Sequence, residues 1–180
     1  MTQELYQKAM KFAGEKHHNQ KMPGHIANYL LHVSNVAMEI LMAHHHLKDF
    51  NLNYAIQVAI LHDVIEDTPT SYDQVERLFG QAVADGVLAL TKSAQIESKE
   101  AMMQDSLRRI NNQPNEVGMV KLADRITNLQ CPPAHWNEEK KSRYLKEAHL
   151  ISEQLTGKNQ YLNDRLEQKM KDYQHYFIGQ

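Results

Sequence analysis

Residues 59–68 read Ala-Ile-Leu-His-Asp-Val-Ile-Glu-Asp-Thr, and this stretch does most to decide how the chain folds. Its apolar residues continue those of the preceding turn and leave few polar positions, which predicts a central helix that other helices cover. Two polar pairs, His62-Asp63 and Glu66-Asp67, interrupt the apolar run one helical turn apart. Unpaired charge is costly among apolar side chains, so the stretch predicts a polar site at the centre of the protein.

The composition indicates a helical protein of one domain. The chain has 180 residues with 7 glycines and 5 prolines, and 42% of the residues are hydrophobic. This length supports a sizeable core, and the scarcity of glycine and proline favours helices over a sandwich or a linker. There is no alternating strand pattern and no internal repeat. We therefore expect a compact all-α helical bundle, formed as a single domain by residues 1–180.

The spacing of apolar residues predicts helices along the whole chain. Pro69 disfavours helical geometry at Thr68 and should end the central helix. Ser71, with Gln74 three residues later, has the sequence of a capping box before the next helix. The predicted helices cover residues 2 to about 18, 29 to about 44, 54–67, 71–79, 81–92, 98–111, 117–130, 138–156 and 161–177.

Charge and cysteine content limit the class of protein. The net charge is −2 at pH 7, so no large basic field is expected for nucleic acid or a membrane surface. Cys131 is the single cysteine, which excludes an internal disulfide and favours a reducing compartment. The N-terminal residues carry no secretory signal, and no apolar run approaches the ~20 residues of a membrane span. We expect a soluble, cytoplasmic protein; the sequence holds no signal for its oligomeric state.

Metal-ligand residue types recur on three predicted helices. His32 lies about thirty residues before His62-Asp63, and Asp124 lies about sixty residues after that pair. Residues i and i+4 share one face of a helix, so Asp124 lies beside Asn128. By the same rule, the two polar pairs of the central helix border one cleft. Three helices can thus direct polar side chains at one point.

Each of these residues has an ordinary alternative interpretation. A lone histidine such as His32 on an apolar helix is usually a satisfied core or surface residue, and Asp124 beside Arg125 fits a surface ion pair. Their combination favours a metal site, because several charged groups within apolar helices need a shared partner and a cation is the simplest one. Two imidazoles and two carboxylates are harder ligands than the thiolates of structural zinc sites. We expect Mn²⁺, with Fe²⁺, Mg²⁺ or Zn²⁺ as substitutes.

The same residues carry a family resemblance. His32, His62-Asp63 and Asp124 match the H…HD…D pattern of the HD superfamily of metal-dependent phosphohydrolases. Nearly the whole chain resembles the hydrolase domain of the bacterial RelA/SpoT proteins, and above all its stand-alone form, the MESH1-like small alarmone hydrolases. The strings that carry this similarity are LLHVSNVAMEIL at 30–41, AILHDVIEDTPTSYDQVERLFGQAVADGVLALTK at 59–92 and VKLADRITNL at 120–129.

The resemblance implies a reaction and a role for the central residues. The reaction is the removal of pyrophosphate from the 3′ position of a small nucleotide, guanosine tetra- or pentaphosphate (ppGpp or pppGpp), with Mn²⁺. Glu66 and Asp67 would orient a water molecule that the cation makes more acidic, and would accept its proton. The metal ligands would be His32, His62, Asp63 and Asp124.

The substrate-binding residues follow partly from the resemblance and partly from position. By the resemblance, Asn128 would contact the nucleotide with Tyr29 beside it, and Lys21 falls where the family usually has an arginine. By position alone, the cations that would neutralise the diphosphate include Lys92, Lys121 and Arg125.

The chain departs from the family pattern in its first loop. The family usually has two basic residues there, whereas this chain has Lys21 followed by Met22. A first alternative is therefore another phosphohydrolase activity on the same site, such as a nucleotide or NADPH phosphatase. A second alternative is a regulatory partner that restrains an alarmone synthetase. A protein that only binds has no need of Glu66 and Asp67, which favours an enzyme.

Overall fold

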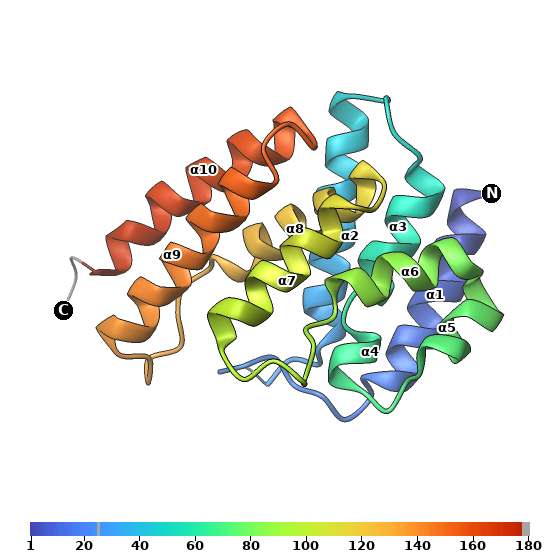
Figure 1. Ribbon diagram of the computed structural model, residues 1–180, viewed down its shortest axis with the longest axis horizontal. Helices are drawn as coiled ribbons and strands as arrows, with labels where there is room; N and C mark the ends of the chain where they lie inside the picture. Colours follow the sequence, from blue (N-terminus) through green and yellow to red (C-terminus); the bar gives the residue numbers. More distant parts are fainter. Residues whose placement is uncertain (25, 178–180) are drawn as a thin grey trace.

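The structure is a computed structural model that describes residues 1–24 and 26–177. Over these residues the fold is all-α, as the sequence predicts (Figure 1). The helices in chain order are α1 (Thr2–Lys16), α2 (Leu30–His46), α3 (Leu52–Leu61), α4 (Val64–Asp67), α5 (Tyr72–Phe79), α6 (Gln81–Leu90), α7 (Lys99–Asn111), α8 (Asn115–Asn128), α9 (Glu138–Gln154), α10 (Gln160–Gln174) and the 3-10 turn η1 (His175–Phe177).

Helices α3 and α8 lie at the centre of the packing. Every residue of α3 from Ala55 to Leu61 is buried, as is every residue of α8 from Val117 to Thr127. Helix α3 packs against α1, α2, α6 and α8, while α8 also packs against α2 and α10. A helix covered on all sides is apolar nearly all round, so the polar side chains that remain on it must meet one another or a ligand.

The helix predicted for 54–67 is interrupted at His62 and Asp63, between α3 and α4. His62 Nδ1 lies 2.8 Å from the carbonyl oxygen of Ala59. A side chain that bonds the backbone in this way competes with the helical hydrogen bonds. At Asp63 φ is −105° and ψ is 0°, outside ideal helical geometry. The prediction of one continuous helix is therefore wrong.

Other helix ends fall where the local sequence predicts them. Thr68 is extended, with φ −133° and ψ 165°, because the ring of Pro69 disfavours a helical residue before it. Ser71 and Gln74 form the predicted capping box at the start of α5. Side-chain N-caps also begin α3, α7, α9 and α10, and each such cap typically stabilises a helix by about 1 kcal/mol.

Helix α6 brings the segment that follows it toward the centre of the molecule. Gly86 permits this close approach, because a Cβ atom there would lie 2.6 Å from the hydroxyl oxygen of Tyr54. Arg109 of α7 donates to three backbone carbonyls around the C-terminal end of α6, at 2.6, 3.0 and 2.7 Å. These bonds satisfy carbonyls that a helix end leaves free. They fix the backbone just before Lys92.

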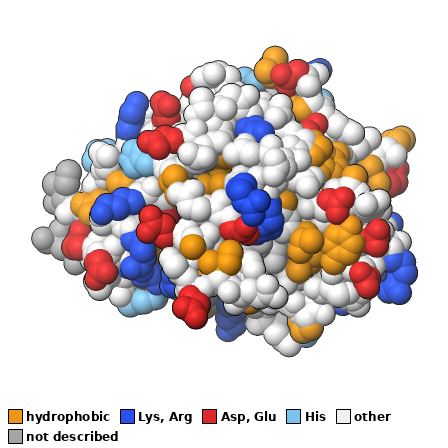
Figure 2. All heavy atoms as spheres, in the orientation of Figure 1, with side chains coloured by type: hydrophobic (Ala, Val, Ile, Leu, Met, Phe, Trp, Pro, Cys, Tyr) orange, Lys and Arg blue, Asp and Glu red, His pale blue; other side chains and the backbone are white. Residues whose placement is uncertain are grey.

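Helices α9 and α10 form a hairpin along one side of the molecule (Figure 1). Helix α10 packs on α8 and, through an ion pair between Arg165 and Glu39, is tied to α2. The hairpin thereby covers part of α8. On the face shown in Figure 2, basic and acidic side chains are interspersed. Within the two described ranges, no helix has both the length and the apolar character needed to cross a membrane.

Candidate metal centre and active site

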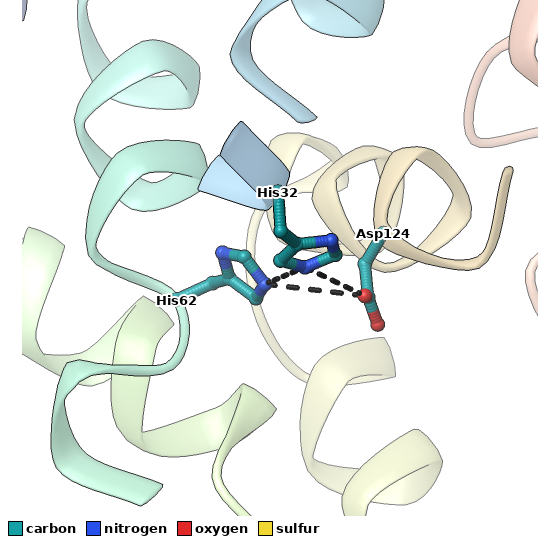
Figure 3. Close-up of side chains that lie close together, drawn as sticks. All are labelled: His32, His62 and Asp124. Atoms are coloured by element: carbon teal, nitrogen blue, oxygen red, sulfur yellow. Dashed lines mark hydrogen bonds and ion pairs between the residues drawn. The ribbon is translucent and has the colours of Figure 1, made fainter. Parts of the chain in front are cut away.

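Three parts of the fold deliver side chains to one buried point (Figure 3). His32 lies in the first turn of α2, His62 directly follows α3, and Asp124 lies in α8. The Nε2 atoms of the two histidines are 3.2 Å apart. The Oδ1 atom of Asp124 lies 3.4 Å from Nε2 of His32 and 3.9 Å from Nε2 of His62. The three ligand atoms thus lie within 4.8 Å of one another.

The second nitrogen of each imidazole is held by a hydrogen bond. His62 Nδ1 faces the carbonyl oxygen of Ala59, which can only accept, so this nitrogen carries the proton. Thr127 Oγ1 donates to the carbonyl oxygen of Asp124 at 2.9 Å. It is therefore left to accept from His32 Nδ1, 3.4 Å away. Nε2 of each imidazole consequently faces inward, in the orientation that metal ligation requires.

Asp63 adds a second carboxylate at the same point. Its Oδ2 atom lies 2.8 Å from Nε2 of His62 and 3.8 Å from Nε2 of His32. Two sequence neighbours meet here because the helix is broken, whereas in a continuous helix they would be ~100° apart. Tyr29 donates its hydroxyl hydrogen to Asp63, and burial together with this carboxylate raises the pKa of Tyr29, so the group stays a donor. We call these four residues the histidine–aspartate cluster: His32, His62, Asp63 and Asp124.

Asp124 is oriented from within its own helix. Lys121 Nζ donates to Oδ2 at 2.8 Å, and Asn128 Nδ2 donates to Oδ1 at 2.5 Å. Burial by itself would raise the pKa of Asp124, but the Lys121 ammonium and the two histidines hold it well below its usual range. Asp124 therefore remains an ionised carboxylate at neutral pH. The contact with Asn128 also agrees with the predicted i, i+4 pairing.

The donor set of the histidine–aspartate cluster fits a divalent cation. Two imidazole lone pairs and two carboxylates converge, and a cation relieves the repulsion among them. Without a metal, the site favours a proton. Burial lowers the pKa of His62, but the Asp63 carboxylate outweighs burial and raises this pKa to about 9. Imidazole and carboxylate ligands are compatible with several first-row divalent ions, so the donor set alone selects none of them.

A cavity of about 230 Å³ includes most of this cluster in its wall. Five carboxylates and three basic side chains line it, so its wall is net negative before a cation binds. Such a wall repels an anionic substrate, which is a second reason to expect a bound divalent ion. The charged lining residues other than His62 are Asp63, Glu66, Asp67, Asp124, Glu147, Lys92, Lys121 and Arg125.

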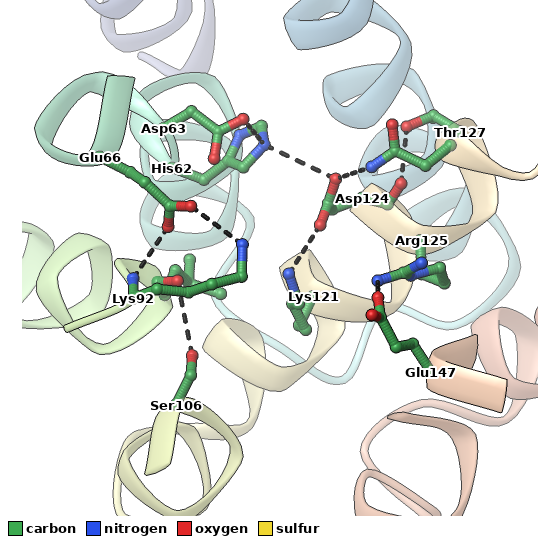
Figure 4. A network of polar contacts seen from close by, with 12 residues as sticks. His62, Asp63, Glu66, Lys92, Ser106, Lys121, Asp124, Arg125, Thr127 and Glu147 are labelled. Atoms are coloured by element: carbon green, nitrogen blue, oxygen red, sulfur yellow. Dashed lines mark hydrogen bonds and ion pairs between the residues drawn. The ribbon is translucent and has the colours of Figure 1, made fainter. Parts of the chain in front are cut away.

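Each of the three basic side chains already has a carboxylate partner (Figure 4). The side chain of Lys92 is 39% exposed, whereas those of Lys121 and Arg125 are 10% and 5% exposed, so Lys92 is the one best able to change partners. The interpretation of Asp124 and Arg125 as a surface ion pair is wrong, because both are buried and each has another partner. We call these side chains the paired cations: Lys92 with Glu66 at 2.9 Å, Lys121 with Asp124 at 2.8 Å, and Arg125 with Glu147 at 3.1 Å.

The carboxylates of Glu66 and Asp67 have different hydrogen-bond partners. Glu66 accepts from the backbone N–H of Lys92 at 2.8 Å and from its ammonium group at 2.9 Å, one bond on each oxygen. Asp67 accepts through Oδ2 from Gln20 Nε2 at 2.8 Å, while its Oδ1 has no hydrogen-bond partner among residues 1–24 and 26–177. Partial burial raises the pKa of Asp67, against the lowering effect of the Gln20 bond. Of the two carboxylates, Asp67 has the open oxygen.

The structure brings together most residues singled out in the sequence. The four candidate metal ligands meet in the histidine–aspartate cluster. Lys21 is the exception, since it is exposed in the first loop, forms a backbone bridge with Asn28, and is not part of the cavity wall. The remaining candidates all line the cavity: Tyr29, Glu66, Asp67, Lys121, Arg125 and Asn128.

Sequence reasoning missed three residues that hold the site together. Thr127 fixes the tautomer of His32, and its place three residues after Asp124 was an available signal. Gln20 and Glu147 reach their partners across 47 and 22 residues, respectively. No local pattern marks contacts of that length.

Comparison with known proteins gives matches along most of the chain. Residues 9–159 match the HD domain family. The guanosine-3′,5′-bis(diphosphate) 3′-pyrophosphohydrolase MESH1 of Danio rerio is 30% identical over 164 residues, covering 88% of this chain and 88% of that protein. MESH1 of Mus musculus is 31% identical over 169 residues, covering 91% of this chain and 92% of that protein.

A solved structure agrees with these matches. It is described as "A metazoan ortholog of SpoT hydrolyzes ppGpp and plays a role in starvation responses". It aligns with a TM-score of 0.80 at 27% identity, and the alignment covers 93% of this chain and 94% of that one. The matched family range contains α2, α3, α4 and α8, the elements that build the histidine–aspartate cluster. The chain therefore belongs to the HD domain family, in which the MESH1 proteins are its relatives.

Proposed function

We propose that the protein removes pyrophosphate from the 3′ position of guanosine tetra- and pentaphosphate, giving GDP or GTP. The observation that carries this proposal is the histidine–aspartate cluster in the wall of an acidic cavity, in a chain whose relatives are named for this reaction. Hydrolysis joins the oxygen of water to the phosphorus next to the ribose and breaks the bond from that phosphorus to the 3′ oxygen. The 3′ oxygen leaves as a hydroxyl group. We place the reaction in the cytoplasm, where the free Cys131 would stay reduced.

The histidine–aspartate cluster would hold the cation, for which we propose Mn²⁺. When bound, a divalent cation supplies Lewis-acid polarisation of a phosphate oxygen and lowers the pKa of a neighbouring water. Hydrogen bonds within the chain preorganise these side chains for that role. Ala59 and Thr127 fix the two imidazole tautomers, while Tyr29 and Lys121 orient the carboxylates.

Asp67 would accept the proton of the attacking water through its open oxygen, and Glu66 would orient that water. Glu66 has both oxygens bonded to Lys92, so the substrate must first draw the ammonium group away. A diphosphate carries more charge than one carboxylate and is the stronger partner for an ammonium group. The backbone N–H of Lys92 would keep Glu66 in place during this exchange. Asn128 and Tyr29 would contact the nucleotide.

A second candidate is a phosphatase that acts on a less charged nucleotide such as NADPH. The paired cations favour it, because every basic lysine or arginine side chain of the described cavity wall already has a carboxylate partner. Met22, where the family usually has a second basic residue in the loop, also favours a less charged substrate. The two candidates share the metal site and differ in how much negative charge the substrate brings.

Metal-stripped protein supplied with Mn²⁺ and ppGpp tests the proposal. We expect GDP and pyrophosphate as products, no turnover in EDTA, and little phosphate release from NADPH in a parallel reaction. Asp124→Asn is the matched inactive control. Release of phosphate from NADPH without turnover of ppGpp, in protein with Mn²⁺ bound, would select the second candidate. Full activity of the metal-stripped protein would contradict both.

A further inference from the structure

A chain of hydrogen bonds runs from the end of α1 to Asp67. His17 Nδ1 lies 2.6 Å from Gln20 Oε1, and Gln20 Nε2 donates to Asp67 Oδ2 at 2.8 Å. A carboxylate accepts only, so the amide nitrogen of Gln20 must face it. The amide oxygen then faces His17 and accepts, which places a proton on His17 Nδ1. One arrangement of protons satisfies all three groups.

The histidine at the start of this chain is fully enclosed. His17 is 0% exposed, and its Nε2 atom is buried without a hydrogen-bond partner within the described structure. Its ring lies 5.0 Å from that of Tyr29, which donates to Asp63. Within the described structure, the bond to Gln20 is therefore the only side-chain hydrogen bond that fixes the orientation of this buried imidazole.

The bridge to Asp67 is not needed to close the first loop. Gln20 is held through its backbone, since its N–H donates to the carbonyl oxygen of His17 and its carbonyl accepts from Tyr29, both at 2.9 Å. The side chain of Asn28 also donates to the carbonyl oxygens of His17 and His18, at 3.2 and 3.1 Å. The loop is therefore anchored by other bonds, and the side chain of Gln20 is left to act on the carboxylate.

We propose that His17 and Gln20 are positioning residues for Asp67. The Gln20 amide holds Oδ2, while Oδ1 of this cavity-lining carboxylate has no hydrogen-bond partner among the described residues. The side-chain amide of Gln20 could rotate by half a turn and place its oxygen against Asp67, which would repel the carboxylate. The Nδ1–H group of His17 prevents this, because it bonds only to the amide oxygen. This inference rests on the role proposed above for Asp67 as proton acceptor.

Substitutions at both positions test the inference by the split between kcat and KM, with Mn²⁺ and ppGpp. Gln20→Met keeps the length of the side chain but removes the amide, so kcat should fall on the order of tenfold while KM and bound Mn²⁺ stay unchanged. His17→Phe should lower kcat in the same way. His17→Asn should keep kcat near the wild-type value, because the asparagine Nδ2 group donates from nearly the place of the imidazole Nδ1. His18→Ala, at the exposed neighbouring histidine, is the control and should match wild type.

A double substitution separates positioning from a general structural role. Gln20→Met should lower kcat no further when Asp67→Asn is already present, because Gln20 acts only through the carboxylate that Asp67→Asn removes. An additional tenfold loss in that background, or a kcat of Gln20→Met above half the wild-type value, would overturn the inference. Neither result bears on the proposed function, which fails when wild-type protein with bound Mn²⁺ does not turn over ppGpp.

The tautomer of His17 gives a readout that needs no activity. Nitrogen NMR of wild-type protein should show a protonated Nδ1 and an unprotonated Nε2 at this residue, and Gln20→Met should remove that preference. The opposite tautomer in wild type would contradict the hydrogen-bond chain directly, whether or not the enzyme is active.

Discussion

The histidine–aspartate cluster and the paired cations share one cavity but differ in how their charges are satisfied. In the cluster, bonds from Ala59, Thr127 and Tyr29 orient the ligands and leave their inward atoms facing one another. The paired cations are complete already, since each has a carboxylate within 3.1 Å. Without a metal, the cluster has only a proton on His62 to offset its two carboxylates, whereas each of the paired cations already has a carboxylate partner.

The cavity is therefore preorganised for a cation and must be rearranged for an anion. Binding a metal supplies a charge that the protein does not provide at that point. Binding a phosphate group exchanges one ion pair for another, and the bond that is broken offsets part of the bond that is gained. We therefore expect strong effects from changes in the cluster and smaller effects from changes among the paired cations.

The largest effect should come from removing a ligand of the cluster. Asp124→Asn should lose bound Mn²⁺ and reduce kcat/KM on the order of 10³-fold, because a bound ion contributes several kcal/mol to the transition state. Metal analysis and kinetics on the same preparation measure both. Asp164→Asn, at an exposed carboxylate of α10, is the control. Normal metal content in Asp124→Asn would show that this carboxylate does not hold the cation.

The next effect concerns chemistry with the metal retained. Glu66→Gln should keep bound Mn²⁺ and lower kcat on the order of 10²-fold, because it removes the carboxylate that we propose orients the attacking water. The exposed Glu153→Gln should behave as wild type. Glu66→Gln with wild-type turnover would show that this carboxylate serves only to hold Lys92.

The paired cations give a smaller effect that appears in KM. Lys92→Met should raise KM for ppGpp about tenfold, the size of one charge-assisted hydrogen bond reduced by the pair it replaces. The value of kcat should stay within about threefold, because the backbone N–H that holds Glu66 remains. Lys171→Met on α10 is the matched control. A collapse of kcat with unchanged KM would instead make Lys92 a positioning residue for Glu66.

The pH dependence of stability tests the missing charge of the cluster. The pKa of His62 is raised to about 9 in the metal-free protein, against about 6.5 in an unfolded chain. Its stabilising contribution is complete below the lower value and is lost as pH rises to the higher one. The Tm in EDTA should therefore decline from about pH 6.5 to about pH 9, while the stabilisation by Mn²⁺ grows because metal must displace the proton. His45→Asn should keep this slope, and a metal-free Tm that rises over the interval would contradict it.

The smallest effect is expected in the first loop. Met22→Lys should lower KM for ppGpp about threefold at low ionic strength, because the neighbouring Lys21 lies outside the cavity wall and attracts only at a distance. The gain should vanish in high salt. Met22→Leu controls for the change in shape. A large drop in KM that persists in salt would mean that the loop closes onto the phosphates.

Much of the fold and of the metal site follows from local sequence. Helix positions, the capping box at Ser71 and the extended Thr68 depend on residues within one or two turns, so a single pass along the chain finds them. The candidate ligands His62, Asp63 and Asp124 are recognisable because each interrupts an apolar stretch of sequence. An unpaired charge there would be costly, so it indicates a partner. The interrupted helix was not recognised, because the bond from His62 to Ala59 that accompanies the break depends on which way the ring turns.

Local sequence predicts an all-helical protein with four candidate metal ligands and two neighbouring carboxylates, because residue type and short spacing suffice for those predictions. Which charges pair depends on the tertiary fold. Glu66 meets Lys92 across 26 residues, Arg125 meets Glu147 across 22, and Asp67 meets Gln20 across 47. Such contacts depend on how helices cross, and helix crossing is set by the packing of the whole core. The same carboxylates can therefore be read from the sequence as site residues, while their partners emerge only from the fold.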